Sequence, residues 1–165
     1  SSKSSDRINN CQKPKIVFAE DALTIQATID EAKGIPQGGV YFGTALDATY
    51  DLRYFQGLYN SSLLTFLFKT LYSGIHMGGG YLRFRTQYLE ELPIREIDFT
   101  VEHDRSQHES LVNLVDHMME LQKIVEPLQS NQLIGEIAQT DRQIDDLVYD
   151  LYGLTEAERS LVEGG

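Results

Sequence analysis

The stretch from Asp51 to Ile94 most constrains the fold, because glycine and proline interrupt its helical periodicity. Apolar residues recur at three- and four-residue steps between Leu58 and Leu71, the spacing of a helix buried along one broad face. The polar run Asn60 to Ser62 offers candidate caps. Thr86 is a candidate N-cap for a second helix through Leu92, which Pro93 would end.

Between these two predicted helices lie a glycine loop and a short strand. Gly74 and the run Gly78 to Gly80 allow positive φ angles and close approach of the backbone to another surface. The segment 81–85 alternates as a strand does and would point Arg83 and Arg85 to one side. The whole stretch therefore predicts helix, glycine loop, strand and helix.

The charge of the chain is unevenly distributed. The net charge is −11, yet residues 13–95 carry eight basic against eight acidic side chains, while residues 96–165 carry four against sixteen. No acidic residue lies between Asp51 and Glu90. That acid-free stretch holds Arg53, Lys69, Arg83 and Arg85. The overall acidity therefore does not exclude a nucleic-acid partner.

The N-terminal part is rich in predicted strands. Residues 1–12 are serine-rich and predict a flexible lead-in. The runs Lys13–Ala19, Leu23–Ile29 and Val40–Thr44 have strand character, with a glycine- and proline-rich loop before the third. We expect residues 13–100 to form a small mixed α/β domain.

Beyond Thr100 the pattern is helical only. Ser106 and Glu109 fit a capping box at a helix start. An apolar stripe runs from Leu111 to Val125 and includes Met118 and Met119, and the helix is expected to break near Pro127.

A second apolar stripe runs from Leu133 to Leu151 and stops at Gly153, a typical helix end. Thr155 and Glu158 form a second capping box, before a short terminal helix through Val162. Two stripes of similar length predict an antiparallel helical hairpin over residues 101–165. The expected fold class is α+β.

The composition of the chain bears on the size of its core and on its cellular compartment. An apolar fraction of 41% over 165 residues supports a real core. No run of ~18 apolar residues is present, so no membrane-spanning helix is expected. The polar N-terminus lacks the apolar core of a signal peptide, and Cys11 is the single cysteine. We expect a cytoplasmic protein.

Three segments resemble one protein family. GLYNSSLLTFLFKT (57–70), GGGYLRFRTQYLEELPI (78–94) and TDRQIDDLVYDLYGLTEAE (140–158) are similar to the C-terminal specificity region of TaqI-like and related adenine-specific DNA methyltransferases of restriction-modification systems. The resemblance covers roughly Lys13 to Gly165. It implies a target-recognition domain that clamps double-stranded DNA, while a separate N-terminal domain transfers methyl groups from S-adenosylmethionine.

The chain itself is not expected to be catalytic. The methyltransferase signature of Asn or Asp, two prolines and an aromatic residue is not in the sequence. The resemblance therefore implies a fragment whose parent is an S-adenosylmethionine-dependent methyltransferase, with restriction endonuclease activity left open. No cofactor is expected on this chain. The expected partners are double-stranded DNA and the methyltransferase domain of the same polypeptide or complex, with no membrane partner and with a homodimer through the helices as an open option.

The DNA-contacting residues expected from this resemblance cluster around the glycine loop. They are Lys69, Ser73, Gly78, Gly79, Gly80, Tyr81, Arg83, Arg85 and Gln87. Each arginine can bind phosphate or the O6 and N7 atoms of guanine, or remain a solvated strand charge, and the resemblance favours DNA contact for at least one. The glycines form either an anion-binding nest or a plain loop. Gln87 either reads adenine or does nothing specific.

Other residue patterns favour structural explanations. Tyr81 and Phe84 are able to stack on a base, but core packing is the preferred interpretation. The histidines, at positions 76, 103, 108 and 117, are interpreted as surface or loop residues. Asp141, Asp145, Asp146 and Asp150 are interpreted as a solvated helix face and not as a metal site.

One further pattern resembles an enzyme. Asp21 followed by Glu31 and Lys33 imitates the acid and acid-x-lysine pattern of many restriction nucleases, a short pattern that is common by chance, so nuclease activity is not expected. The alternative function is a protein-interaction or dimerisation module that acts through the acidic hairpin.

Overall fold

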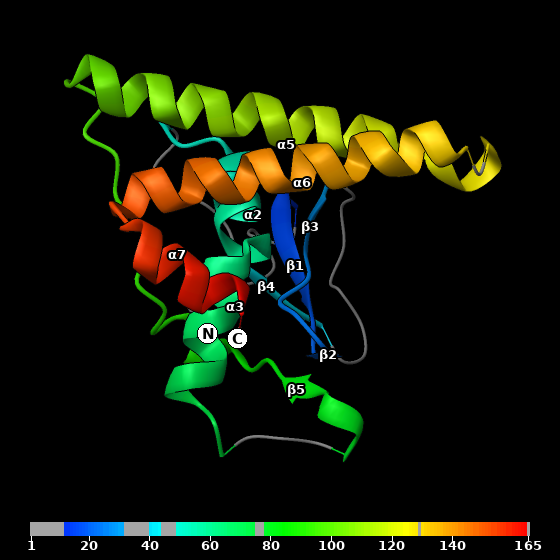
Figure 1. Cartoon of the computed structure of the whole chain (residues 1–165), viewed down its shortest axis with the longest axis vertical. Coiled ribbons are helices and arrows are strands. Elements are labelled where there is room, and N and C mark those ends of the chain that lie inside the picture. The colour runs from blue at the N-terminus through cyan, green and yellow to red at the C-terminus, as the bar shows by residue number, and fades with distance from the viewer. Residues whose placement is uncertain (1–11, 32–39, 44–48, 75–77, 129, 165) are drawn as a thin grey trace.

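A computed structural model describes residues 12–31, 40–43, 49–74, 78–128 and 130–164. A small antiparallel sheet and two short helices lie beneath a long helical hairpin (Figure 1). This arrangement confirms the α+β class. Cys11, Lys33 and His76 lie outside the described residues.

The main sheet has β1 (Lys15–Ala19) at its centre, between β3 (Ala27–Asp30) and β4 (Val40–Gly43). Both pairings are antiparallel, and Val17 lies opposite Thr28 on one side and Phe42 on the other. Ile16 and Phe18 are buried, as the alternation of a strand requires. All three predicted strands are present; the first two are shorter than predicted, and Thr44, the last residue of the third predicted strand, lies outside the described residues.

A two-residue strand, β2 (Asp21–Ala22), follows β1 after Glu20 and pairs with β5 (Leu82–Arg83). The sequence predicted residues 20–22 only as the connection between two strands. Leu23 to Gln26 belonged to the predicted second strand but lie outside β3, and the Ile25 amide donates instead to Thr65 Oγ1 at 3.2 Å. Side-chain bonding from a distant helix thus takes over this part of the chain.

The predicted central helix is two helices, α2 (Leu52–Asn60) and α3 (Ser62–Leu71). Ser61 separates them with an extended backbone, and its hydroxyl donates to Leu58 O at 2.6 Å and accepts from the Leu64 amide at 3.3 Å. One side chain therefore satisfies the end of one helix and the start of the next. Ser61 is among the caps that the sequence offered.

The segment after α3 contains less helix than predicted. Gly78–Gly80 form a turn, η1, in which Gly79 has non-helical φ and ψ angles, and the second helix, α4, covers only Thr86–Leu89. The prediction of a Thr86 cap and an end at Leu92 was wrong. Arg85 occupies the N-cap position without a side-chain cap, so a single turn is all that forms.

Three helices complete the chain: α5 (Glu102–Leu128), α6 (Asn131–Tyr152) and α7 (Glu156–Glu163). The Ser106 capping box was a wrong prediction, because α5 already begins four residues earlier with Glu102 and Asp104 in its first turn. The predicted helix end near Pro127 is confirmed.

The C-terminal signals are also confirmed. Gly153 ends α6 in the left-handed region at φ 66°. Thr155 and Glu158 form both bonds of the capping box that opens α7.

The hairpin is continuous with the rest of the core. Leu111 and Val115 of α5 are buried with Leu58 of α2 and Val148 of α6 in one apolar cluster. A Cβ placed on Gly57 would lie 2.9 Å from both Leu111 Cδ1 and Val115 Cγ2, so this glycine lets α2 and α5 approach closely. The boundary near residue 100 stays a prediction.

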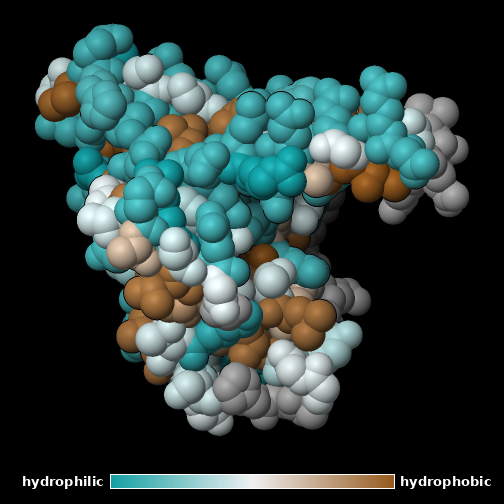
Figure 2. Space-filling view, viewed as in Figure 1, coloured by the Kyte–Doolittle hydropathy of each residue, from teal (hydrophilic) through white to brown (hydrophobic). Residues whose placement is uncertain are grey.

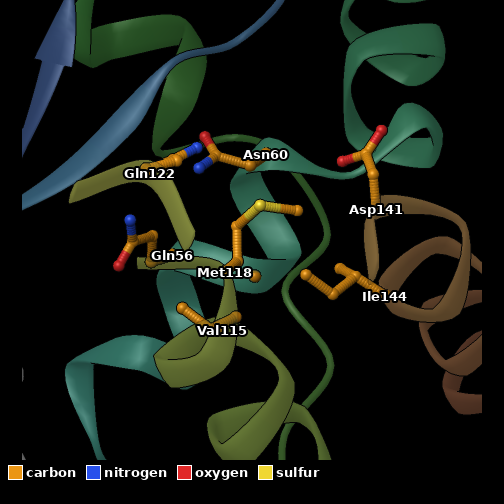
Figure 3. Close-up of a pocket in the computed structure, with 8 residues that line it drawn as sticks. Gln56, Asn60, Val115, Met118, Gln122, Asp141 and Ile144 are labelled. Carbon is orange, nitrogen blue, oxygen red and sulfur yellow. The ribbon is translucent and has the colours of Figure 1, made fainter. Parts of the chain in front are cut away.

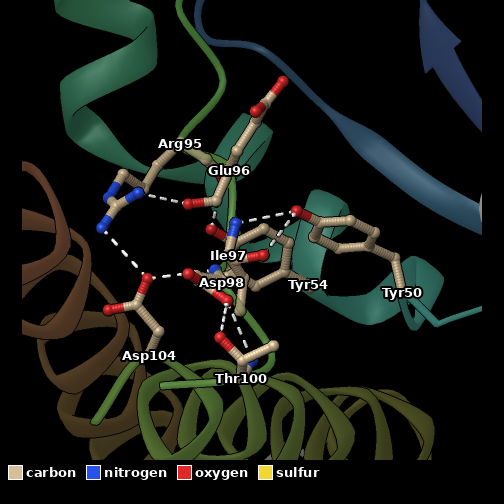
Figure 4. A network of polar contacts seen from close by, with 8 residues as sticks. All are labelled: Tyr50, Tyr54, Arg95, Glu96, Ile97, Asp98, Thr100 and Asp104. Carbon is tan, nitrogen blue, oxygen red and sulfur yellow. Dashed lines mark hydrogen bonds and ion pairs between the residues drawn. The ribbon is translucent and has the colours of Figure 1, made fainter. Parts of the chain in front are cut away.

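Polar contacts hold the segment between α4 and α5 (Figure 4). The Ile97 amide donates to the Tyr50 hydroxyl at 2.7 Å, and the Tyr54 hydroxyl donates to Arg95 O at 2.7 Å. Arg95 also pairs with Asp104 at 3.2 Å. These bonds fix the base of the hairpin to α2, so the hairpin has a defined direction relative to the sheet. Among the described helices, none is both long and apolar enough to cross a membrane.

Candidate nucleic-acid interface

The predicted DNA-contacting residues lie at the end of the molecule farthest from the α5–α6 hairpin (Figure 1). Lys69 is in the last turn of α3, and Ser73 follows that helix. The glycine turn, Tyr81, and β5 with Arg83 come next along the chain. Most of the acidic residues beyond residue 95 belong to the distant hairpin, so the charge asymmetry seen in sequence is also an asymmetry in space.

An aromatic cluster joins the two segments that carry these residues. The Phe68 and Phe84 rings are 4.7 Å apart, and the Tyr72 and Tyr88 rings are also 4.7 Å apart. Phe84 is fully buried, which confirms the core interpretation for this residue and excludes it from base stacking, whereas the core interpretation of Tyr81 was wrong, because that side chain is 47% exposed. The cluster holds the end of α3 against β5 and α4.

The glycine turn requires glycine at two positions. Gly79 and Gly80 both have φ of 82°, where other residues are strained. The Tyr81 ring lies 3.7 Å from the place of a Cβ on Gly79, and Leu23 Cδ2 lies 3.9 Å from that on Gly80. Tyr81 is 47% exposed and Leu23 is 53% exposed, so the turn is bordered by two accessible apolar side chains.

Arg83 is engaged by carboxylates that are distant in sequence. Its Nε donates to Asp21 Oδ1 at 3.1 Å and lies 3.9 Å from Glu20 Oε1. These acids come from β2 and the residue before it, not from the acidic hairpin. The Arg83 side chain is 34% exposed, so it is accessible while paired.

The other predicted cations and polar groups differ in environment. Arg85 is exposed and Lys69 is half-buried, and neither forms an ion pair within the described ranges. Ser73 and Gln87 are exposed. Gly78 is the first residue of the glycine turn. The structure thus gathers these residues around one end of the chain's fold.

Arg53 does not belong to this surface. Its guanidinium donates to Asp51 at 2.7 Å and to Asp116 of α5 at 2.7 Å. The Arg53 hydrogen bond lowers the pKa of the Asp51 carboxyl. This pair fastens α2 to the hairpin.

Most residues of the nuclease-like pattern and of the aspartate row on α6 that are described below form contacts within the fold. Asp21 pairs with Arg83, as described, and Glu31 is exposed. Asp145 accepts from the Ser62 amide at 2.8 Å and from its hydroxyl at 2.6 Å, at the start of α3. Arg159 donates to Asp150 at 2.6 Å. Across the described part of the chain, no three His, Cys, Asp or Glu side chains are grouped as a metal site.

His108 departs from the sequence interpretation of the histidines. It is 7% exposed on α5, with its ring 5.0 Å from Tyr54, and Nε2 accepts from the Asp51 amide at 3.5 Å. Burial lowers the pKa of the His108 imidazole. It is a core residue and not a surface one.

A small pocket lies elsewhere, between α2, α5 and α6 (Figure 3). Met118 lies at its centre, with Asn60, Gln122 and Asp141 around it. The Gln56 side chain lines it and donates through Nε2 to Ala27 O at 3.3 Å, while its buried Oε1 has no described partner. None of the predicted DNA-contacting residues lines this pocket.

The surface differs between the two ends of the molecule. The visible face of the hairpin is mainly hydrophilic, whereas apolar atoms are more frequent over the lower half (Figure 2). Exposed apolar residues near the glycine turn and α3 include Leu23, Leu71 and Tyr81. On such a surface the cationic groups are suited to contact the phosphates of a nucleic acid, and the accessible apolar groups are suited to contact its bases.

Sequence reasoning missed the contribution of β2. Asp21 reaches Arg83, and Leu23 reaches the glycine turn, because β2 pairs with β5, about sixty residues later in the chain. No local signal marks such a pairing; the only hint was that Asp21 follows a predicted strand.

Comparison with known proteins identifies the family of the chain. Residues 1–94 match the family model of the TaqI-like C-terminal specificity domain. The type II methyltransferase M.XhoI of Xanthomonas vasicola is 30% identical over 149 residues. That match covers 90% of this chain and 22% of the methyltransferase, so the chain spans less than a quarter of its relative's length. By the match over more than half of its residues, the chain belongs to the TaqI-like C-terminal specificity domain family.

Proposed function

We propose that this chain is the DNA sequence-recognition module of a restriction-modification adenine-specific DNA methyltransferase. The single observation that supports this best is that the glycine turn, Arg85 and Lys69 occupy one accessible end of a domain from a specificity family, away from the acidic hairpin. Phosphate contacts by the cations would give affinity, and contacts to base edges would give specificity.

Catalysis is assigned to a methyltransferase domain outside this chain. The prolines of the sequence are isolated from one another, so the double proline of the adenine methyltransferase signature does not occur here. S-adenosylmethionine would supply the methyl group on that other domain. The role of this chain's residues is to hold and orient DNA, in a cytoplasmic enzyme.

DNA binding and its salt dependence test the proposal. The double variant Lys69→Ala, Arg85→Ala should bind duplex DNA more weakly, and the slope of log affinity against log salt should fall by about two. A matched control, Lys123→Ala with Arg142→Ala, removes the same charge from exposed positions on α5 and α6. The control should keep the wild-type slope. Equal binding by both double variants would contradict the proposal.

A second candidate function is protein interaction through the hairpin. Its free end projects beyond the sheet (Figure 1), and Ile124 and Ile134 near that end are 42% and 54% exposed. The stripe through Leu111, Val115 and Leu121 is buried within the chain, so it is not available for a dimer. We propose the free end as the contact to the methyltransferase domain, or to a second copy.

Sedimentation at several concentrations separates these partners. A homodimer through the free end would shift toward monomer in an Ile124→Ser, Ile134→Ser variant. A monomer at all concentrations would leave the methyltransferase domain as the proposed partner.

A further inference from the structure

The pair of strands β2 and β5 has one buried and one exposed face. Ala22 lies opposite Leu82, and both are buried, with Phe84 continuing the buried side. The Phe84 amide donates to Glu20 O at 2.7 Å and extends the pairing by one residue. Because side chains alternate along a strand, the residues between these must face outward.

The outward face carries an ion pair and accessible apolar groups. Asp21 lies opposite Arg83, and their side chains are joined at 3.1 Å. Tyr81 precedes the paired residues on one strand and Leu23 follows them on the other, and both are about half exposed. Arg85 has an extended backbone, with φ −102° and ψ 148°, so the alternation that places Arg83 outward continues to it.

We propose that the exposed face of the β2–β5 pair is the base-reading element, in which Leu23 contacts bases and Asp21 positions the Arg83 guanidinium. This inference rests on the proposed function and adds two residues, Asp21 and Leu23, that lie outside the glycine-loop segment. The occupant is double-stranded DNA, because Leu23 and Tyr81 border the glycine turn and share the outward face with Arg83 and Arg85.

The chemistry of the Asp21–Arg83 pair supports a positioning role. A flexible arginine loses side-chain entropy when it forms a bidentate bond to guanine, and a carboxylate that already holds Nε reduces that loss. The bond to Asp21 is made through the Arg83 Nε. Leu23 offers methyl groups, which suit contact with the thymine methyl group in the major groove.

The structural alternative is that the ion pair merely stabilises the strands. Cross-strand pairs of opposite charge do this in many sheets. In that case a loss of Asp21 would affect folding but would leave the preference among DNA sequences unchanged. Discrimination between duplexes is therefore the informative readout.

The experiment compares two duplexes. One is selected from a randomised duplex library with the wild-type protein, and the other has the same composition in scrambled order. Asp21→Asn and Leu23→Ala should each weaken binding to the selected duplex by about tenfold or more, as expected for loss of a base contact. Binding to the scrambled duplex should change by less than about threefold, because phosphate contacts remain. Asp21→Glu should restore part of the discrimination.

Matched controls exist within the chain. Asp116→Asn removes an acid that also pairs with an arginine, Arg53 at 2.7 Å, but lies on α5. Leu161→Ala removes a leucine that is 65% exposed on α7. Both controls should keep the wild-type discrimination. Circular dichroism and urea unfolding establish that each variant is folded.

The outcomes separate this inference from the proposed function. If Asp21→Asn and Leu23→Ala behave like their controls while Lys69→Ala, Arg85→Ala loses binding, the strand face does not read bases and the recognition function stands. Equal losses on both duplexes would also overturn base reading. If selection yields no preferred duplex and the Lys69, Arg85 variant binds as wild type does, the proposed function itself fails.

Discussion

At the scale of single residues, burial gives His108 a pH-dependent effect on stability. Its folded pKa is lowered from the ordinary value of 6.5 because the imidazole is buried among aromatic rings. The unfolded chain therefore binds the proton more readily than the folded one. The corresponding stability is fully present above the unfolded pKa and is lost as the pH falls below 6.5 toward the folded pKa.

This sign leads to a prediction for His108→Gln. Between about pH 7.5 and about pH 5.5, the wild-type urea midpoint should fall further than that of the variant, which keeps an acceptor but does not titrate. His103→Gln, an exposed position on the same helix, serves as the control and should follow the wild type. A variant that loses stability as steeply as wild type would contradict the assignment to His108.

Two helical glycines provide a second residue-scale prediction. Alanine favours a helix over glycine by about 1 kcal/mol. At Gly135 nothing lies within 4 Å of an added Cβ, so Gly135→Ala should raise the free energy of unfolding by about 0.5–1 kcal/mol. At Gly57 the added Cβ would meet buried side chains at 2.9 Å, so Gly57→Ala should lower it by about 1 kcal/mol or more.

Chemical denaturation of both variants measures these values. Shifts of the same sign would show that α2 and α5 do not depend on close approach at Gly57.

At the scale of elements, tyrosine hydroxyls connect the segment 93–98 to α6 and to the residues just before α2. Tyr50 accepts from the Ile97 amide at 2.7 Å, and Tyr152 accepts from the Arg95 amide at 3.0 Å while donating to Pro93 O at 2.6 Å. A backbone amide that loses such a partner costs about 1–3 kcal/mol if it stays buried, or opens to water.

The two tyrosines therefore predict different changes in amide exchange. Tyr50→Phe should speed hydrogen exchange at Ile97, and Tyr152→Phe should speed it at Arg95. Each variant is the control for the other, and NMR or mass spectrometry resolves the two positions. Faster exchange over the whole segment in both variants would show that it opens as one unit instead.

Local pattern was sufficient to predict most elements but few contacts. Periodicity predicted the strands, the two hairpin helices and the ends at Gly153 and Thr155, because these signals reside in neighbouring residues. The break at Ser61 was visible as a candidate cap, but the apolar stripe continued through it. Ser106 resembled a cap although the acidic turn before it starts the helix.

The candidate site shows the same limit. The glycine turn and the outward direction of Arg83 followed from sequence, because both are local properties. The partner of Arg83 did not, since Asp21 reaches it only through the β2–β5 pairing. A stretch without acids in sequence is therefore less cationic in space than composition indicates.

At the scale of the whole molecule, one continuous core supports two ends of different character. The hairpin end is rich in acidic residues and mostly hydrophilic (Figure 2), and the opposite end carries the glycine turn and β5, to which Arg83 belongs (Figure 1). The segment fixed by Tyr50 and Tyr54 connects them. In the proposed function this arrangement keeps DNA away from the acidic helices, which are left to contact protein.

Hydrogen exchange with and without duplex DNA tests this account most directly. At low salt, DNA should slow exchange in peptides that cover residues 69–89 and leave those of α5 and α6 unchanged. The same protection should decline as salt rises, because the contacts are largely electrostatic. Protection confined to the α5–α6 hairpin, or none at any part of the chain while DNA is bound, would contradict the placement of the DNA surface at the glycine turn.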